Sequence, residues 1–274
     1  MKSDQLTHWE TASREIAAEA GAAILDIYGE EFDVVSKADD SPLTQADLAS
    51  HRVITAALAR LTPHIPLLSE ESADIPFSER TRWQEYWLID PLDGTKEFIK
   101  RNGEFTVNIA LIRAHRPVMG VVHVPVTGVT YSGIVGAGAQ RHERDGAARR
   151  ISVRLPSAQP PVVVGSRSHA NPDLERHLAA LGEYELVSMG SSLKFCLLAE
   201  GLADFYPRLG PTSEWDTAAA HAVVLAAGGQ IVTLDGEPLR YNLKDSLLNP
   251  PFLVIADADR DWVGLFRSPD ARGA

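Results

Sequence analysis

The stretch from Trp87 to Thr95 constrains the fold most, because a strand pattern in it gives way at once to a cluster of polar groups. Aromatic and branched residues from Tyr86 to Ile89 favour a buried strand, and the chain continues as Asp-Pro-Leu-Asp-Gly-Thr. These residues predict a turn, because proline fixes φ and Gly94 tolerates dihedral angles that other residues avoid. Two carboxylates, a carbonyl, two backbone N–H groups and a hydroxyl would then converge at one strand end.

The chemistry of these groups suggests a site for a cation and a phosphate. The carboxylates of Asp90 and Asp93 and the carbonyl of Leu92 are hard oxygen ligands of the kind that suit Mg²⁺. The N–H groups of Gly94 and Thr95, at the start of a short helix, suit phosphate. Asp-Pro and Asp-Gly pairs are also ordinary turn chemistry, so this stretch alone leaves a plain turn as the alternative.

Further acidic residues lie at the ends of other predicted elements. Asp47 lies three residues after Thr44, the spacing of a capping box, so a capping role and a functional role are equally open. Glu70 ends a short apolar strand in a segment that could be a solvated loop. Asp216 opens a helix, where the dipole alone favours an acid. If a cleft gathered these groups, their ionised forms would repel one another and need a cation. The gathered set would be Glu70, Asp90, Asp93 and Asp216.

The order of predicted elements divides the chain near residue 155. Residues 1–154 read as helices followed by an antiparallel meander, and the charged run from Arg141 to Arg150 as an exposed turn between strands. Residues 155–274 alternate strands and helices, which indicates a mixed or parallel sheet flanked by helices. The fold class is therefore α/β, with an α+β first half. The glycines near residue 136 do not form the dinucleotide-binding pattern.

Composition excludes several classes of protein. A formal net charge of −11 disfavours general binding to nucleic acid or anionic membranes. The single cysteine, Cys196, excludes an internal disulfide and lies in an apolar run typical of a core. No run approaches the roughly 18 apolar residues of a membrane span. We expect a cytoplasmic protein, monomer or homodimer, and loose association with the inner membrane stays open.

The acidic positions occur in an order that resembles the inositol monophosphatase superfamily of lithium-sensitive, Mg²⁺-dependent phosphatases. The superfamily pattern is an Asp, then Glu-Glu, then Asp-Pro-Ile/Leu-Asp-Gly-Thr/Ser, then Trp-Asp-x-Ala-Ala. This chain matches it with Asp47, Glu70-Glu71, the stretch from Asp90 to Thr95, and Trp215 to Ala219. The resemblance implies a layered αβαβα sandwich of the inositol monophosphatase and fructose-1,6-bisphosphatase type, with the site between the two halves.

Within the superfamily the chain most resembles the bacterial 3′(2′),5′-bisphosphate nucleotidases. The residues that carry this resemblance are Lys96 to Ile99, Asn102 to Ile109, Ser166 to His169, Gly190 to Cys196 and Tyr206 to Arg208. It implies hydrolysis of the 3′-phosphate of adenosine 3′,5′-bisphosphate, a by-product of sulfate assimilation, to AMP and phosphate without a covalent phosphoenzyme.

Three alternatives stay open at this stage. One is a phosphatase of the same fold that acts on inositol monophosphate or another sugar phosphate. Another is a catalytically silent metal-binding regulatory protein. A structural Ca²⁺ module is disfavoured, because no EF-hand loop is present.

The resemblance also implies a role for each residue of the metal site. Glu70, Asp90 and the Leu92 carbonyl would hold one Mg²⁺. Asp90, Asp93 and Asp216 would hold a second, and Glu70 would share a weaker third. The catalytic set is Asp47, Glu70 and Thr95: Thr95, bonded to Asp47, would orient the attacking water.

Substrate contacts rest on the same resemblance. Lys194 and Arg208 are candidates for a second phosphate, and arginine suits bidentate phosphate binding. A solvent-facing helix lysine is an equal alternative for Lys194, and a helix cap is one for His169. The predicted substrate-binding set is Glu70, Leu92, Asp93, Gly94, Thr95, Ser168, His169, Ser192, Lys194, Arg208 and Asp216.

Overall fold

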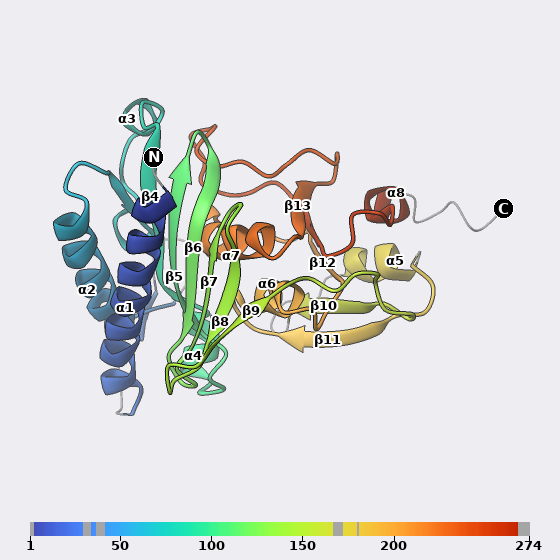
Figure 1. Cartoon of the computed structure of the whole chain (residues 1–274), viewed down its shortest axis with the longest axis horizontal. Helices are drawn as coiled ribbons and strands as arrows, with labels where there is room; N and C mark the ends of the chain where they lie inside the picture. The colour runs from blue at the N-terminus through green and yellow to red at the C-terminus, as the bar shows by residue number, and fades with distance from the viewer. Residues whose placement is uncertain (1–2, 30–33, 37–41, 167–171, 180, 268–274) are drawn as a thin grey trace.

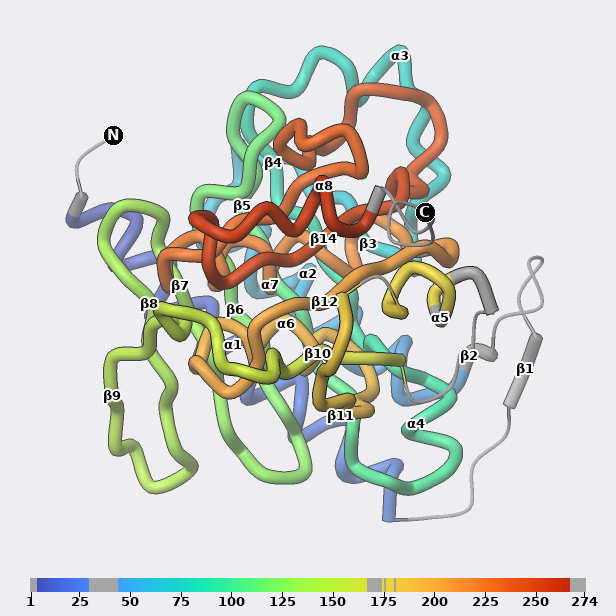
Figure 2. The backbone as a smooth tube through the Cα atoms, turned by 90° about the vertical axis from the view of Figure 1, so that its right-hand side faces the viewer, coloured from blue at the N-terminus to red at the C-terminus, as the bar shows by residue number. Residues whose placement is uncertain are grey.

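Helices and sheets alternate as layers across the molecule, as the computed structural model shows (Figure 1). The structure describes residues 3–29, 34–36, 42–166, 172–179 and 181–267. In Figure 2 the molecule is turned so that the second sheet and α8 (Trp262–Arg267) lie toward the viewer. The layer order is helices, sheet, helices, sheet, helices, so the predicted αβαβα sandwich is confirmed.

The first sheet has seven strands in the order β3-β4-β5-β6-β7-β8-β9. Only β3 and β4 are parallel, and the other neighbours are antiparallel, so the predicted meander is confirmed. The exposed turn predicted between strands for Arg141 to Arg150 is confirmed at residues 143–147, but both ends of that run pair as strands β8 and β9. The strands are β3 (Leu67–Ser69), β4 (Glu85–Asp93), β5 (Thr106–Arg113), β6 (Arg116–Val124), β7 (Val129–Ile134), β8 (Gly138–His142) and β9 (Ala148–Ile151).

Two helices cover the outer face of this sheet: α1 (Ser3–Tyr28) and α2 (Gln45–Leu61). Their apolar residues meet alternate residues of β4, β5 and β6 in one buried cluster. Trp9 of α1 packs on Trp87 of β4 with ring centroids 6.2 Å apart. The two-stranded ladder of β1 (Val34–Ser36) and β2 (Pro42–Thr44) precedes α2. This buried cluster packs against one face of β4 and thereby fixes the position of that strand.

The inner face carries α7 (Glu214–Ala226) and α6 (Leu193–Ala199). Gly120 and Gly133 pair across β6 and β7 and lie directly beneath α7. A Cβ on Gly120 would lie 2.1 Å from the carbonyl oxygen of Ala219, and one on Gly133 2.9 Å from Cα of Val223. The alanine-rich helix therefore packs its backbone directly against the sheet.

The second sheet has five strands in the order β11-β10-β12-β14-β13. β10 is parallel to β11 and β12, whereas β14 is antiparallel to β12 and β13, so the predicted mixed sheet is confirmed. On its outer face Phe205 stacks on Trp262 of α8 at 4.6 Å. The elements are β10 (Val162–Ser166), α5 (Pro172–Ala179), β11 (Glu185–Met189), β12 (Phe205–Arg208), β13 (Gln230–Thr233) and β14 (Phe252–Ile255).

One buried cluster joins the two sheets through α6 and α7. Cys196 is buried in it, as predicted. The division near residue 155 stays a prediction. Across the described ranges, no helix combines the length and apolar character that crossing a membrane requires.

Candidate active site

The end of β4 is a bulge in the strand and not the predicted turn. Asp90 pairs with Asn108 and Asp93 with Thr106, and the register of the ladder shifts between these pairs. Neighbouring groups hold the bulge: Ser50 donates to the Pro91 carbonyl at 2.7 Å, and the Leu92 N–H donates to Oδ1 of Asp90 at 3.0 Å. The prediction of a turn is wrong because β5 continues to pair with the chain past Pro91.

Gly94 closes the bulge and begins the short helix α4 (Thr95–Ile99). Its φ of 92° lies in the left-handed region, which glycine adopts without strain. A Cβ here would lie 3.2 Å from both the Glu104 carbonyl oxygen and Cβ of Ser191. Glycine therefore lets the backbone pass close to two other segments at the site.

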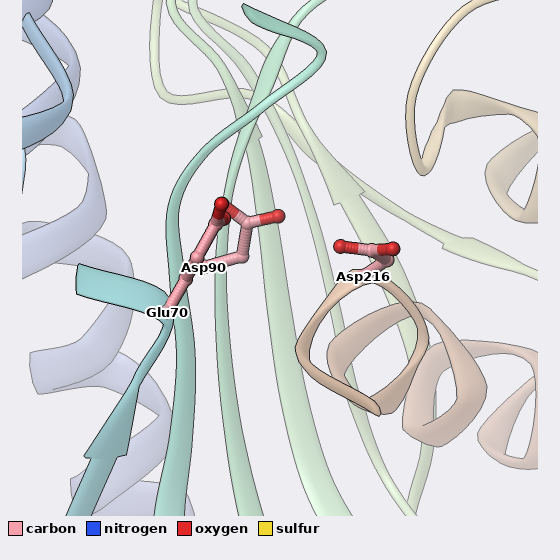
Figure 3. A group of neighbouring side chains, drawn as sticks. All are labelled: Glu70, Asp90 and Asp216. Carbon is pink, nitrogen blue, oxygen red and sulfur yellow. The ribbon is translucent and has the colours of Figure 1, made fainter. Parts of the chain in front are cut away.

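Three carboxylates from distant parts of the chain meet beside this bulge (Figure 3). Glu70 begins the short 3₁₀ helix η1 (Glu70–Ser72) after β3, Asp90 lies on β4, and Asp216 lies in the first turn of α7. One oxygen from each lies within 4.8 Å of the others. A capping box holds Asp216, whose Oδ2 accepts the Ser213 N–H at 2.8 Å.

The electrostatics of this cluster favour a bound cation. Burial, followed by the nearby carboxylates of Glu70 and Asp93, raises the pKa of Asp90 well above its usual value. Burial, followed by Asp93 and Glu70, does the same to the pKa of Asp216. Ionised carboxylates so close together repel one another, and an all-oxygen donor set suits Mg²⁺. The residues present therefore fit a divalent cation.

Asp93 lies near Asp90 and Asp216 but is not one of the three carboxylates within 4.8 Å of one another, and its Oδ2 faces a different set of groups. Its Oδ2 accepts the N–H of Ser192 at 2.6 Å and the Ser192 hydroxyl at 2.5 Å. Burial raises the pKa of Asp93, while Lys194 and the bonds from Ser192 act to lower it. Asp93 also lines the cavity described below.

Thr95 and Asp47 make the contact that the family resemblance implied. The Thr95 hydroxyl donates to Oδ1 of Asp47 at 3.3 Å. The other oxygen of Asp47, Oδ2, accepts the N–H and the hydroxyl of Thr44 at 2.8 and 2.6 Å. The two roles left open for Asp47 are therefore compatible, because each uses its own oxygen.

A cavity of about 260 Å³ opens next to Asp93 and Asp216. Lys194 reaches it from α6, is 7% exposed and donates from Nζ to the Ser191 carbonyl at 2.6 Å. The alternative of a solvent-facing Lys194 is wrong, and burial lowers the pKa of Lys194 to about 8. The lining residues include Gly94, Thr95, Lys96, Glu97, Ser166, Gly190, Ser191, Tyr206, Arg208, Pro211 and Thr212.

Of the other residues predicted to contact the substrate, one lines the cavity, one does not, and two lie outside the described residues. Arg208 lines the cavity, where its Nε donates to Oγ1 of Thr212 at 2.6 Å. Ser192 is 1% exposed and lies against Asp93 instead of lining the cavity. Ser168 and His169 lie outside the described residues.

The structure adds residues that sequence reasoning did not single out. Ser50, on α2, bonds the carbonyl of Pro91, and Asn108 pairs with Asp90 across the sheet and bonds Ser192. Asn108 lies in a segment that carried the family resemblance. Its contacts could not be predicted from the sequence, because they depend on the register between β4 and β5. Nothing in the sequence near Ser50 marks its contact, because it depends on the packing of α2.

The chain belongs to the inositol monophosphatase family, because residues 5–259 match the model of that family. Among curated relatives, the 3′(2′),5′-bisphosphate nucleotidase CysQ of Escherichia coli strain K12 is 55% identical over 243 residues, covering 88% of this chain and 96% of the relative. The enzyme of the same name from Haemophilus influenzae is 37% identical over 254 residues, covering 92% of this chain and 94% of the relative.

A solved structure agrees with these relatives. The crystal structure of CysQ from Bacteroides thetaiotaomicron matches with a TM-score of 0.80 and 45% identity over 90% of this chain and 96% of that one. An inositol monophosphatase from Anabaena matches with a TM-score of 0.75 and 26% identity over 96% of this chain and 95% of that one. The resemblance seen in the motifs is thus confirmed.

Proposed function

We propose that this protein is a Mg²⁺-dependent 3′(2′),5′-bisphosphate nucleotidase that converts adenosine 3′,5′-bisphosphate to AMP and phosphate. The observation that carries the proposal is the cluster of Glu70, Asp90 and Asp216 beside a cavity that contains a buried lysine. The names of the CysQ relatives support the nucleotide as substrate. On the family resemblance we also propose a cytoplasmic location and a place in sulfate assimilation.

The residues that would hold two or three Mg²⁺ ions are Glu70, Asp90, the Leu92 carbonyl, Asp93 and Asp216. Bound Mg²⁺ supplies an activated water, polarises the phosphate and neutralises the leaving oxygen. The fold of the chain fixes where these ligands lie: Asp90 lies at the bulge in β4, and Asp216 is held by the capping box of α7.

Thr95 and Asp47 would orient the attacking water. Because the Thr95 hydroxyl donates its proton to Asp47, the oxygen of Thr95 is left to accept a proton from water. Asp47 is 1% exposed, so it is shielded from bulk solvent while it holds that hydroxyl. The N–H groups of Gly94 and Thr95, at the start of α4, would bind the phosphate that is hydrolysed.

Lys194 and Arg208 would bind the second phosphate, which favours a bisphosphate over an inositol monophosphate. Both residues line the cavity, next to the carboxylate cluster but outside it. A monophosphate ester has no second phosphate for these two cationic side chains to bind, so it gains none of their charge-assisted hydrogen bonds. Inositol monophosphate or another sugar phosphate is the second candidate, because the metal cluster alone does not distinguish between them.

Phosphate release from adenosine 3′,5′-bisphosphate and from inositol 1-phosphate tests the proposal, each measured with Mg²⁺ and with a chelator. We expect turnover that requires Mg²⁺ and strongly prefers the nucleotide. Preference for the inositol ester would agree with the proposed metal site but contradict the proposal that the cavity binds the nucleotide. Mg²⁺ binding without turnover of either ester would indicate a silent metal-binding protein.

Replacement of Lys194 by Gln separates the two substrates. We expect KM for the bisphosphate to rise about 10- to 100-fold, the effect of losing a hydrogen bond to a charged group, with little change for inositol 1-phosphate. Lys100→Gln is the control, because Lys100 is exposed and does not line the cavity. Equal changes in KM for both esters would contradict the assignment of Lys194.

A further inference from the structure

The two oxygens of the Asp93 carboxylate have very different surroundings. Oδ2 accepts the N–H of Ser192 at 2.6 Å and its hydroxyl at 2.5 Å. The amide of Asn108 and the hydroxyl of Thr106 approach the same oxygen at 3.4 and 3.5 Å. Among the described residues, no hydrogen bond to Oδ1 is present. The hydrogen-bond donors that the described part of the chain offers to this carboxylate are thus directed at one oxygen.

The hydrogen bonds around Ser192 have a consistent direction. Nδ2 of Asn108 donates to the Ser192 hydroxyl oxygen at 2.7 Å, so the Ser192 proton is available to an acceptor. Two acceptors lie near it: Asp93 at 2.5 Å and the main-chain oxygen of Asp216 at 3.1 Å. The bond to Asp93 is shorter, and hydrogen bonds to ionised groups are the stronger kind. Asn108 therefore directs the Ser192 proton to Asp93.

The segment that carries Ser192 is held in place from the first half of the chain. The N–H of Gly190 donates to Oε2 of Glu104 at 2.8 Å. A Cβ on Gly190 would lie 2.8 Å from Cγ of Glu97, so the backbone packs closely against α4 and the loop after it. Ser192 is 1% exposed. Its two donors are consequently presented to Asp93 in a fixed position.

We propose that Ser192, oriented by Asn108, is a positioning residue that occupies one oxygen of Asp93 and keeps the other directed toward a divalent cation. Donors that hold one oxygen of a ligating carboxylate fix the orientation of the whole group. Residues hydrogen-bonded to metal ligands typically change metal affinity by 10- to 100-fold when they are replaced. The proposal rests on the proposed function, because it assumes that Asp93 is a ligand.

Mn²⁺ binding to the substrate-free protein, followed by electron paramagnetic resonance, tests the proposal with Mn²⁺ in place of Mg²⁺. We expect Ser192→Ala to weaken one class of Mn²⁺ sites by about 10-fold, the lower end of that range, because the N–H of Ser192 remains. Ser132→Ala is the matched control: Ser132 is also a buried serine with a side-chain partner, His142, on a strand remote from Asp93. An equal, small effect of both variants would overturn the proposal.

A double-mutant cycle isolates the contact with Asp93. In an Asp93→Asn background, Ser192→Ala should weaken Mn²⁺ binding no further, because the group it positions is already lost. An undiminished effect of Ser192→Ala in that background would overturn the proposal. If Ser192→Ala shows no cooperative thermal unfolding, Ser192→Cys replaces it, because cysteine keeps the size and only weakens the donor.

Turnover separates this proposal from the proposed function. For Ser192→Ala we expect the Mg²⁺ concentration at half-maximal rate to rise, with KM for the bisphosphate unchanged, since Ser192 does not line the cavity. A rise in that KM alone would assign Ser192 to the substrate and overturn the positioning role. If the wild-type protein hydrolyses no bisphosphate, the proposed function fails, while Mn²⁺ binding still tests the role of Ser192.

Discussion

Asp47 shows how a single residue serves both a helix and a site. One oxygen completes the capping box of α2 with Thr44, and the other accepts the Thr95 hydroxyl. Replacing the acid by Asn removes acceptor capacity from one of these contacts, because an amide nitrogen can only donate. The two contacts can be tested separately.

We predict that Asp47→Asn lowers kcat roughly 10- to 100-fold, as replacements of residues that orient a metal site do. Thr44→Ala is the control: it removes the cap but leaves Thr95 and Asp47 in contact. It should lower the free energy of unfolding by about 1 kcal/mol and leave kcat at 20 °C near the wild-type value. Steady-state kinetics and urea unfolding of both variants make the comparison. Near wild-type turnover of Asp47→Asn would rule out the role of Thr95 and Asp47.

The sequence predicted the acidic residues of the site, because their types and order are distinctive. It left Lys194 open, because the position of a lysine on a helix does not reveal which neighbours cover it. The structure shows α6 between the two sheets, where Lys194 is 7% exposed and its Nζ lies 5.7 Å from the centroid of the Tyr206 ring. Ser192 was assigned to the substrate for the same reason: its partner comes from the other half of the chain.

At the scale of elements, the packing of α7 on β6 and β7 sets the position of Asp216. The paired glycines Gly120 and Gly133 place no side chain of their own between helix and sheet, so the backbone of α7 comes close to the sheet there. The N-terminus of α7, and Asp216 with it, therefore approaches the end of β4 closely enough to join Asp90. A side chain on either glycine would move the helix away from the sheet.

We predict that Gly120→Ala lowers the free energy of unfolding by about 1–3 kcal/mol, the typical cost of overpacking, and raises the Mg²⁺ concentration needed for activity. Its Cβ would lie 2.1 Å from the Ala219 carbonyl oxygen, a backbone atom that can move only with the helix. Gly29→Ala is the control, because the nearest atom to its Cβ is 3.9 Å away. If Gly120→Ala unfolds like Gly29→Ala in urea, α7 is less tightly packed than the structure indicates.

Local signals predicted some elements well and others poorly. The capping box placed the start of α2 correctly, because that signal depends only on nearby residues. The bulge of β4 was predicted as a turn, because Pro91 and Gly94 are typical turn residues and the pairing with β5 that overrides them is distant. The turn between β8 and β9 was predicted too long, because glycine and alanine have weak strand propensity and pairing with distant residues decides where these strands end.

At the scale of the whole molecule, the ionised carboxylate cluster destabilises the fold unless protons or a bound cation neutralise its charge. Burial and mutual repulsion raise the pKa values of Asp90 and Asp216 above their usual value of 3.8. The folded chain therefore keeps protons that the unfolded chain releases, so its stability falls as the pH rises above about 4. A bound cation can replace those protons.

We predict that the difference in Tm between samples with Mg²⁺ and samples with a chelator grows from pH 5 to pH 8. At pH 8 and about 100 times the dissociation constant, Mg²⁺ should raise Tm by roughly 5–10 °C. Calorimetry at matched ionic strength, with NaCl in place of the magnesium salt, provides the control. A difference in Tm that is independent of pH would mean that the cation does not compete with protons on these carboxylates.

The separation of the cluster along the chain has a consequence for the order of events during synthesis. The ribosome makes Glu70 and Asp90 early, but Asp216 emerges only after most of the chain, together with the helix that must settle on β6 and β7. A growing chain that already contains the whole first sheet still lacks one of the three acids. A nascent chain therefore cannot assemble the three-acid cluster until translation has passed Asp216.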